Sequence, residues 1–474
     1  MSILQHLRFI YPELVLVGFA LAAMMGAIFV KRQSLIGFGA LIGVVLGMFL
    51  LPVSFEAGPA ILANMLKHDS FSVFFRTVIL LIAGLIVLLS IGDKEGNRED
   101  VGEYYFFLLT VTVAMMIAVS ANNLMMIYIA VETISIISYI MAAFLKRNVT
   151  SSEAGMKYFL FGALSTGVML YGISLLYGLL GTLSLPVMMQ AITTNAVNPA
   201  ALTLSVILVI VGLGFKCSLV PFHMWTPDVY EGAPTPVSAL LSVGPKAVGF
   251  ALFIRIFVEN IVPLNFPWVN LAAAMAIVTM TVGNISALKQ NNIKRLLAFS
   301  TIAQAGYIFI GLTAGTAAGT KATLFYLFVY TLMNLGAFAA VIAISNSLKS
   351  EAIEHYAGLY KKEPFTAIAL VISLLSLAGL PPLSGFLAKF FVLAAAVEAK
   401  LIFLAVIAVI NSVIALYYYI RVIKFMFLHE PSGEYSTSRS VALTIALTVT
   451  VLGNIILGVW PHPVLNWLTS LLPV

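Results

Sequence analysis

Long apolar runs dominate the chain, and short segments rich in charge, Pro or Gly separate them. A helix needs about 20 apolar residues to cross roughly 30 Å of hydrocarbon, and about 14 runs are long enough. The pattern therefore predicts an all-α polytopic membrane protein. The predicted spans are residues 10–30, 34–54, 70–92, 104–120, 122–145, 154–180, 201–224, 236–258, 267–288, 293–314, 321–346, 364–397, 401–427 and 440–461.

The Lys and Arg residues between these runs indicate how the chain crosses the membrane. With the N-terminus outside, 15 of them fall in inner loops, 5 in outer segments and 5 within spans. Cytoplasmic loops carry an excess of Lys and Arg, so we expect 14 helices with both termini outside. The inner residues are Lys31, Arg32, Lys94, Arg98, Lys146, Arg147, Lys289, Lys294, Arg295, Lys349, Lys361, Lys362, Arg421, Lys424 and Arg439, and the outer ones are Arg8, Lys67, Arg255, Lys321 and Lys400.

Parts of the sequence recur at a fixed distance, which suggests two related units. Asn122-Asn123 opens the fifth span, and Asn291-Asn292 opens the tenth, 169 residues later. Spans seven and twelve are both interrupted near proline. Chance matches between apolar helices are common, so a true repeat and coincidence both stay open. Further matches are Gly167 with Gly336, Lys157-Tyr158-Phe159 with Tyr326-Leu327-Phe328, and Ile254-Arg255 with Ile420-Arg421.

A true repeat makes spans 4–8 and 9–13 two five-helix units. Because each unit has an odd number of helices, the two have inverted topology, with broken helices 7 and 12 in equivalent places. Inverted repeats with broken helices are typical of transporters, whose sites lie near the bilayer midplane. The predicted organisation is an N-terminal three-helix segment (1–103), a first repeat (104–260), a second, inverted repeat (261–430) and a C-terminal helix (431–474).

Composition supports a membrane protein and excludes several other classes. Hydrophobic residues make up 61% of the 474 residues and charged residues 9%, whereas a soluble domain carries about 25% charged residues. The 25 basic and 19 acidic side chains are too few to cover soluble domains, and the net charge of +6 is spread over short loops. A soluble enzyme, a disordered chain and a nucleic-acid binder are therefore excluded.

Other counts limit the chemistry. Cys217 is the one cysteine, so neither a disulfide framework nor a cysteine-ligated iron–sulfur cluster can form within the chain. No GxGxxG or GxxxxGK-S/T sequence follows a strand pattern, which leaves no sign of a nucleotide site. The run 12–30 is long enough to span the membrane and does not read as a cleaved signal.

Ionisable residues inside the spans are the strongest functional signal. Each Lys or Asp at a helix centre costs about 2.5–3.5 kcal/mol on insertion scales, so such groups must be paired, hydrated or functional. Glu132 lies about ten residues from either end of the fifth span. Lys216 precedes Pro221, which interrupts the seventh span and frees backbone carbonyls. Both suit proton exchange, although Glu132 could instead tie helices through a salt bridge and Lys216 could pin the freed carbonyls.

Two more lysines lie beside residues that loosen a helix. Lys246 directly follows Gly244-Pro245 near the middle of the eighth span, and its alternative role is packing against the break in the seventh. Lys389 follows Pro381-Pro382 by about two turns, and its alternative role is snorkelling to the outer interface. A sodium site would need more carboxylates and carbonyls, so one deep carboxylate with several lysines favours protons as the transported ion.

Three further residues are weaker candidates. Lys157 lies about one turn into the sixth span, where snorkelling is an equal alternative. His223 follows Pro221, where it could relay protons near neutral pH or cap the broken helix. Arg76, two turns into the third span, is expected to snorkel or to contact another subunit. With water, polar residues on spans ten and eleven could bridge Lys246 to Lys389; they are Ser300, Thr301, Gln304, Tyr307, Tyr326 and Tyr330.

Several of these segments resemble subunit N of respiratory complex I, the proton-translocating NADH:quinone oxidoreductase. They are PFHMWTPDVYEGAPTPVSALLSVGPKAVGF (221–250), AVETISIISYIMAAF, EAGMKYFLFGALSTGVMLYGISLLYG, NIKRLLAFSTIAQAGYIFIGL and LAGLPPLSGFLAKFF. The resemblance covers nearly all of the chain. Subunits M and L and the multi-subunit sodium/proton antiporters share the plan, but they usually have His or Ala where this chain has Val229-Tyr230-Glu231-Gly232, which favours the N type.

The resemblance implies a fold of 14 helices with two inverted five-helix repeats. It implies that Glu132 and Lys216 are the family's paired carboxylate and lysine, Lys246 its central lysine, Lys389 the lysine of the second broken helix and Lys157 a further lysine of span six. It implies no cofactor or metal in this chain, with NADH, flavin, iron–sulfur clusters and quinone in partner subunits. Protons are expected to reach Lys216 from inside, pass to Lys246 and Lys389 and leave outside, driven by quinone reduction elsewhere.

The resemblance also implies a location and partners. We expect a multi-pass protein of the bacterial cell (inner) membrane, and the thylakoid or an organelle membrane is the second choice because chloroplasts and cyanobacteria have a similar subunit with a different electron donor. The expected partners are membrane lipids, an M-like subunit, K-, J- and A-like neighbours and the lateral helix of an L-like subunit, with no nucleic acid. Two alternatives stay open, a subunit of a multi-subunit sodium/proton antiporter and a passive scaffold.

Overall fold

The computed structural model describes residues 8–30, 33–56, 60–62, 64–93, 100–194, 197–259, 268–431 and 440–471. This part of the chain is almost entirely helical. Five basic residues that contribute to the expected orientation lie outside the described residues, namely Lys31, Arg32, Lys94, Arg98 and Arg439.

Thirteen of the described helical segments are long and apolar enough to cross a membrane. The one remaining predicted span, 364–397, consists of two shorter helices, so the prediction of about 14 spans is confirmed. The long helices are α2 (Tyr11–Phe29, after the 3-10 turn η1, Arg8–Ile10), α3 (Gln33–Glu56), α4 (Ser70–Gly92), α5 (Val101–Ser120), α6 (Leu124–Ala142), α7 (Val149–Leu180), α9 (Pro199–Cys217), α11 (Thr235–Phe253, continued by the π-helical turn η3, Ile254–Val258), α12 (Trp268–Ala287), α13 (Ile293–Thr313), α14 (Ala317–Leu348), α18 (Ile402–Leu428) and α19 (Val441–Val459).

Shorter elements connect these helices. At ten residues, α8 and α20 are too short to span, and the two strands form an antiparallel hairpin. The elements are β1 (Ala60–Leu62), β2 (Leu66–His68), α8 (Leu185–Thr194), α10 (Trp225–Gly232), η5 (Ile353–Tyr356), α15 (Leu359–Lys362), α16 (Pro364–Ala378), α17 (Ser384–Glu398) and α20 (His462–Leu471).

The seventh predicted span is broken, as expected, but the helix ends earlier than predicted. α9 stops at Cys217 because Ser218 adopts the left-handed conformation (φ 57°). Pro221 follows in a cis peptide bond with Val220 and has no backbone N–H to continue the helical ladder. The predicted range 201–224 therefore includes a turn that is not helical.

The twelfth predicted span is broken in the same way. α16 stops at Ala378, and Gly379 adopts the left-handed conformation (φ 86°), which glycine takes without steric cost. The Pro381–Pro382 peptide bond is cis, and α17 starts two residues later. Both breaks therefore combine a left-handed residue with a proline three residues on.

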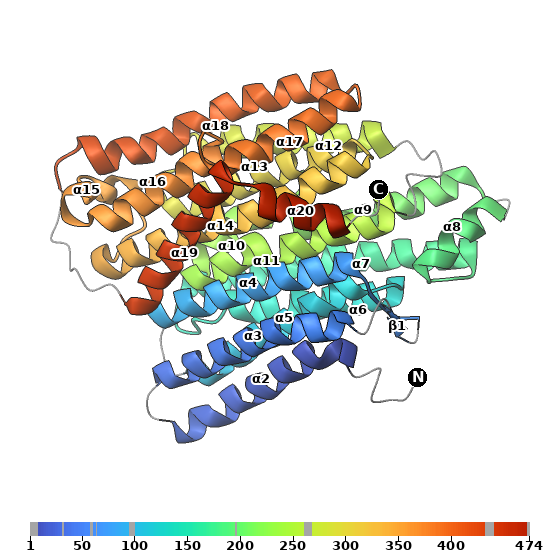
Figure 1. Cartoon of the computed structure of the whole chain (residues 1–474), viewed down its shortest axis with the longest axis horizontal. Coiled ribbons are helices and arrows are strands. Elements are labelled where there is room, and N and C mark those ends of the chain that lie inside the picture. The colour runs from blue at the N-terminus through green and yellow to red at the C-terminus, as the bar shows by residue number, and fades with distance from the viewer. Residues whose placement is uncertain are drawn as a thin grey trace. The chain divides into compact units, whose positions relative to one another are not determined.

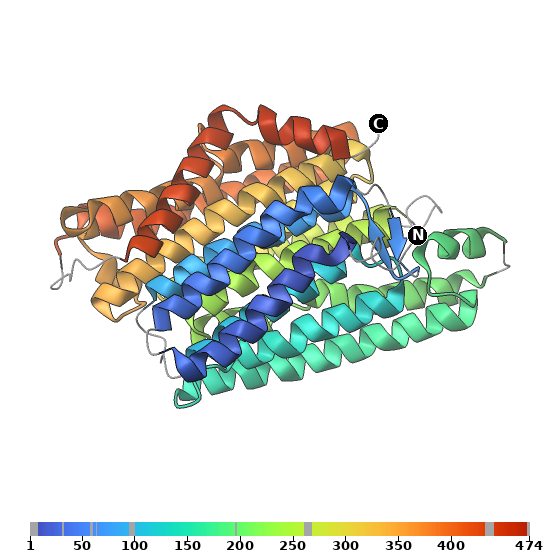
Figure 2. The same ribbon diagram turned by 60° about the horizontal axis from the view of Figure 1, so that its bottom comes forward.

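The chain divides into two compact units. Unit 1 comprises Met1–Gly84, Arg98–Ser218 and Gly244–Trp268, and unit 2 comprises Leu85–Asn97, Leu219–Val243 and Val269–Val474. In unit 1, α2, α3 and α5 pack against one another, and α7 packs along α9 (Figures 1 and 2). In unit 2, α14 packs against α13, α16, α17 and α19.

Matching features inside the two units support the sequence repeat. Asn123 caps α6 by accepting a hydrogen bond from the amide of Met125 (2.8 Å), and Asn292 caps α13 by accepting one from the amide of Lys294 (2.8 Å). A helix of 32 residues follows each capped helix, α7 in one case and α14 in the other. The matched asparagines thus cap equivalent helices, which supports the repeat.

Two arginines provide a second matching feature. Arg255 donates to the carbonyl of Val119 (3.1 Å) at the end of α5, and Arg421 donates to the carbonyl of Leu288 (3.0 Å) just after α12. Cations are favourable at helix C-termini, whose last carbonyls lack helical partners. Val119 and Leu288 are 169 residues apart, the offset of the sequence repeat. Five spans per repeat make the topology of the second repeat inverted.

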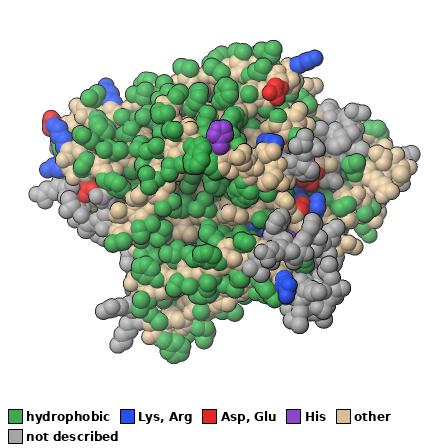
Figure 3. Space-filling view, viewed as in Figure 1, with side chains coloured by type: hydrophobic (Ala, Val, Ile, Leu, Met, Phe, Trp, Pro, Cys, Tyr) green, Lys and Arg blue, Asp and Glu red, His purple; other side chains and the backbone are tan. Residues whose placement is uncertain are grey.

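The surface is suited to lipid. Most side chains visible on the face shown in Figure 3 are hydrophobic, and few are charged. On α18 alone, Ile402, Phe403, Val413 and Leu428 are between 61% and 76% exposed. Soluble monomers rarely expose contiguous apolar patches of such extent, so this helix faces hydrocarbon or another membrane subunit.

Candidate functional site

Lys216 lies in the last turn of α9, one residue before the helix ends. Its side chain is 3% exposed, and among the described residues its Nζ has no hydrogen-bond partner. The centroid of the Phe215 ring is 5.8 Å from Nζ. Glu132 on α6 is half-buried and lies within electrostatic range of Lys216. The carboxylate and lysine that the sequence paired thus lie near each other within unit 1.

Lys246 is the lysine that holds the freed carbonyl at this break. Its Nζ donates a hydrogen bond to the carbonyl of Cys217 (3.0 Å), the last residue of α9. The side chain is 1% exposed. Helix α11 continues through Gly244-Pro245 without a break, with Pro245 inside the helix. The proposed pinning of carbonyls belongs to Lys246 and not to Lys216.

Lys389 occupies the corresponding place at the second break. Its Nζ donates to the carbonyl of Ala378 (2.8 Å), the last residue of α16, and to Oγ of Ser412 (2.8 Å). Nζ also lies 4.5 Å from the ring centroid of Tyr307, a cation–π distance. The side chain is 6% exposed, so the alternative that Lys389 snorkels to the interface is wrong.

The two breaks therefore share one chemical arrangement. A carbonyl at a helix C-terminus lacks an intrahelical partner and carries partial negative charge, and a buried lysine amine satisfies it at both places. A lysine can also release and take up a proton, which distinguishes it from a serine or asparagine cap. Within the described ranges, no three His, Cys, Asp or Glu side chains could together hold a metal ion.

The polar residues expected on spans ten and eleven form buried contacts within unit 2. Gln304 accepts a hydrogen bond from Tyr326 (2.5 Å) and donates to the carbonyl of Leu377 (2.8 Å), near the end of α16. Tyr330 donates to Thr301 (3.1 Å). The remaining contacts are those of Ser300 with Tyr419 (2.5 Å) and of Tyr307 with Asn284 (3.2 Å).

The two weaker candidates make other contacts. Lys157 forms an ion pair with Glu153, one turn earlier on α7 (2.8 Å), and its side chain is 37% exposed, which favours snorkelling. His223 is buried in the turn between α9 and α10, and its backbone carbonyl accepts the amide of Thr226 (3.0 Å). The relay role predicted for each stays a prediction.

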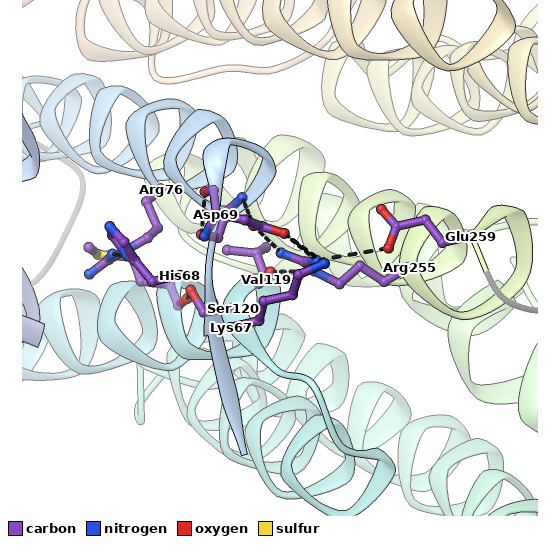
Figure 4. A network of polar contacts seen from close by, with 10 residues as sticks. Lys67, His68, Asp69, Arg76, Val119, Ser120, Arg255 and Glu259 are labelled. Atoms are coloured by element: carbon purple, nitrogen blue, oxygen red, sulfur yellow. Dashed lines mark hydrogen bonds and ion pairs between the residues drawn. The ribbon is translucent and has the colours of Figure 1, made fainter. Parts of the chain in front are cut away.

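Sequence reasoning missed a buried ion network in unit 1 (Figure 4). The expectation that Arg76 snorkels or contacts another subunit is wrong, because its side chain is 1% exposed. Arg76 donates to both carboxylate oxygens of Glu13 (2.5 Å), to Nδ1 of His68 (3.0 Å) and to the carbonyl of Phe9 (3.0 Å). Glu13 is 63 residues away, so no local pattern could reveal the pair.

Asp69 and Arg255 form the other half of the network. Arg255 donates to the two carboxylate oxygens of Asp69 (2.7 and 2.9 Å), and Lys67 lies 3.2 Å from one of them. Burial acts to raise the pKa of Asp69, but hydrogen bonds and charge from Arg255 outweigh it and hold that pKa below its usual range. The match of Arg255 with Arg421 was the one sequence signal of this cluster.

A second missed cluster lies in unit 2 near the start of α13. Lys294 and Arg295, which were counted among the inner basic residues, lie in the first turn of this helix. Lys294 pairs with Glu351 (2.7 Å), and Arg295 bridges Asp228 and Glu231 of α10 (2.7 Å each). The Arg295 pairs join α10 to the start of α13, and the Lys294 pair joins that start to the segment after α14.

The His68 contacts predict how acid affects stability. Burial, and next the positive charge of Arg76, lower the pKa of His68 from 6.5 to about 4, against a smaller opposing effect of Asp69. As pH falls, this histidine is protonated in the unfolded state before it is protonated in the folded state. The contribution of neutral His68 to the stability of the fold is therefore complete above about pH 6.5 and is lost as pH falls toward 4. We expect the His68→Gln variant to lose less stability than wild type as pH falls from 6.5 to 4, by up to about 3 kcal/mol. The measurement is thermal unfolding of the assembled complex at each pH. The exposed His429→Gln is the control, and equal acid sensitivity of wild type and His68→Gln would contradict the prediction.

The chain matches one family over most of its length. The family described as NADH:quinone oxidoreductase/Mrp antiporter, TM matches residues 121–415. NADH-quinone oxidoreductase subunit N of Trichlorobacter lovleyi is 40% identical, over 98% of this chain and 96% of its own length. NAD(P)H-quinone oxidoreductase subunit 2 of Synechococcus elongatus is 44% identical, over 84% of this chain and 78% of its own.

A solved structure agrees with these relatives. A chain of respiratory complex I from Thermus thermophilus, solved with bound aureothin, has a TM-score of 0.82 and 31% sequence identity to this chain. The similarity covers 96% of this chain and 98% of that one. The resemblance inferred from the sequence segments is therefore confirmed over the whole length.

Proposed function

This chain belongs to the family of antiporter-like membrane subunits of NADH:quinone oxidoreductase, and on that premise we propose that its buried lysines carry protons across the membrane. It is a proton-translocating subunit of complex I of the N type. The chemistry of NADH oxidation and quinone reduction belongs to other subunits, and the proposal concerns the path of the proton through this one.

One observation carries the proposed path. Lys246 and Lys389 are buried, and each donates to the last carbonyl of a broken helix. Lys216 is buried at the first break with Glu132 in electrostatic range. Buried ionisable groups in membrane helices are costly and commonly mark ion pathways, and irregular backbone at membrane depth is tolerated where it lines a cavity or is buried in protein.

The proposed sequence of steps starts at the first break. A proton from the inside reaches Lys216, and Glu132 sets the charge state of that lysine. The proton then passes to Lys246 and on to Lys389, from which it leaves on the outside. Lys157 and His223 have a secondary place in the proposal, as residues that deliver protons to this path.

Electrostatics gives the pair of Glu132 and Lys216 enough energy to act as a gate. Two unit charges 4 Å apart attract by about 4 kcal/mol at an effective dielectric constant of 20. Moving one charge across about 180 mV costs a similar amount, about 4 kcal/mol. Forming and breaking the pair can therefore oppose a proton-motive force.

The finer assignments belong to the same proposal. The subunit lies in a bacterial cell (inner) membrane with both termini outside, next to an M-like subunit, K-, J- and A-like neighbours and the lateral helix of an L-like subunit. NADH, flavin, iron–sulfur clusters and quinone bind in partner subunits, which supply the redox energy. The 15-to-5 distribution of basic residues supports the orientation.

A sodium/proton antiporter subunit is the second candidate, because the matched family also contains Mrp antiporters. The assembled complex, reconstituted in liposomes, distinguishes the two. We expect NADH-driven proton transport to keep its rate when sodium is replaced by choline, and no uptake of labelled sodium. Transport that stops without sodium would favour the antiporter.

A passive scaffold is tested separately. Joint replacement of Lys216, Lys246 and Lys389 by Met would leave transport intact in a scaffold, and we expect it to abolish the proton transport of this subunit.

A further inference from the structure

We infer that Asn454 on α19 is a positioning residue for Lys389, because it holds together the two halves of the second broken helix. The inference rests on the proposed function, since it concerns the last lysine of the proposed proton path. Helix α19 lies outside the two five-helix repeats, and neither the lysines nor the breaks of the proposed path are on it. All of the residues in the argument belong to unit 2.

The Asn454 amide bridges the break. Its Oδ1 accepts a hydrogen bond from Oγ of Ser376 (2.9 Å), in the last turn of α16, and another from Oγ of Ser384 (2.8 Å), the first residue of α17. Oγ of Ser376 in turn accepts the amide N–H of Gly385 (3.1 Å). All three polar side chains are fully buried, so these hydrogen bonds have no competition from bulk water.

The orientation of the amide is fixed from its own helix. Nδ2 of Asn454 donates to the carbonyl of Thr450, one turn earlier (2.8 Å). This contact uses the donor end of the amide and leaves the acceptor end facing the two serines. Because a serine hydroxyl can donate and a carbonyl oxygen can accept twice, both Ser376 and Ser384 can be satisfied at the same time.

A glycine on the same face of α19 supports the inference independently. Gly458 lies one turn after Asn454, and a Cβ there would overlap the carbonyl oxygen of Pro382 and lie 2.7 Å from the carbonyl carbon of Leu383. Backbone atoms cannot move aside as a flexible side chain can. Helix α19 therefore packs directly onto the turn between α16 and α17, and only glycine permits this approach.

Holding the break determines what Lys389 can reach. Its Nζ lies 2.8 Å from the carbonyl of Ala378, across the gap from its own helix. Ala378 is two residues after Ser376, and Lys389 is five residues after Ser384. The Asn454 bridge therefore fixes the separation of the two chain ends that the lysine spans. Without the bridge, α16 and α17 are joined at the gap by the turn, by the lysine and by the hydrogen bond from Gly385 to Ser376.

The test uses the complete complex in liposomes and measures protons moved per NADH oxidised, normalised to assembled complex. Asn454→Leu keeps the γ-branched shape of Asn, although it is larger, and lacks the acceptor. We expect it to slow proton transfer through this subunit about tenfold, since two hydrogen bonds are lost. Asn454→Asp keeps an acceptor oxygen but loses the Nδ2 donor to Thr450, so it should restore only part of the transport. Gly458→Ala, which moves α19 off the turn, should lower transport in the same direction.

Controls separate positioning from general stability. Thr448→Val removes a hydroxyl of α19 that bonds to its own helix at Thr444 (2.8 Å), and it should leave transport unchanged. A positioning role also predicts that Asn454→Leu shifts the pH profile of transport, because the surroundings of Lys389 change. A merely structural role would lower the amount of complex and leave the profile of the assembled fraction unaltered.

The possible outcomes are distinguishable. If Lys389→Met lowers transport but Asn454→Leu and Gly458→Ala do not, the inference is overturned and the proposed function stands. If Lys216→Met and Lys389→Met both leave transport intact, the proposed function fails first. If Asn454→Leu does not assemble, Gly458→Ala decides; a wild-type pH profile and ratio in that variant overturns the inference.

Discussion

Replacing Lys216 by Met is expected to abolish proton transport through this subunit while the complex still assembles. Met has a similar shape and no charge, so the buried space at the end of α9 stays filled, and the lysine has no hydrogen bond among the described residues to lose. What disappears is the group that can hold a proton opposite Glu132. The measurement is the number of protons moved per NADH oxidised by the complete complex in liposomes.

The size of the effect follows from the loss of the proton carrier. Methionine cannot take up a proton, so the proposed path has no acceptor at the first break. The variant should therefore show no measurable transport by this path. The exposed Lys424→Met is the matched control, and it should behave like wild type.

A second variant asks whether Lys216 carries the proton or only supplies charge. Arginine keeps the positive charge opposite Glu132 but does not release its proton in proteins. We expect Lys216→Arg to be as inactive as Lys216→Met. If Arg restores wild-type transport, Lys216 is an electrostatic partner alone, and the proposed path must begin at another residue.

Breaking the Glu13–Arg76 pair is expected to have the largest effect on stability. Removing one member of a buried ion pair leaves an uncompensated charge, at a cost of about 3–5 kcal/mol. Arg76→Met leaves the Glu13 carboxylate buried without its partner, and it also frees the carbonyl of Phe9. Thermal unfolding of the assembled complex should therefore occur at a clearly lower temperature.

The double variant makes this prediction specific. Glu13→Gln together with Arg76→Met removes both charges, so the loss should be smaller than the sum of the two single losses. The exposed Arg8→Met, in the same segment of the chain, should be nearly neutral. Additive losses in the double variant would show that the two side chains do not stabilise the fold as a pair.

The breaks could be predicted from the sequence, but their detailed chemistry could not. Pro221 and Pro381-Pro382 revealed the interruptions, and Lys216, Lys246 and Lys389 stood out because charge is costly inside a span. Tertiary packing decides which lysine caps each freed carbonyl. Lys246 donates to the carbonyl of Cys217, which is 29 residues away in the sequence. The neighbouring Gly244 and Pro245 do not indicate this contact.

The buried ion network shows the same limit more strongly. Arg76 lies two turns from a span end, and by depth alone such a residue snorkels. Its burial depends on Glu13, which lies in a different helix, and on His68 from the hairpin. Pairing between segments distant in sequence follows from the packing of helices, and a single sequence does not contain it.

The hydrogen bonds of Lys389 have a consequence for repeated turnover. An ammonium group has three N–H donors, and a neutral amine retains two. Lys389 has two acceptors, the carbonyl of Ala378 and Oγ of Ser412. When Lys389 loses a proton, both hydrogen bonds can therefore stay in place. The lone pair on Nζ is then free to receive the next hydrogen ion. The helix end stays capped in either state, so the scaffold need not be rebuilt in each cycle.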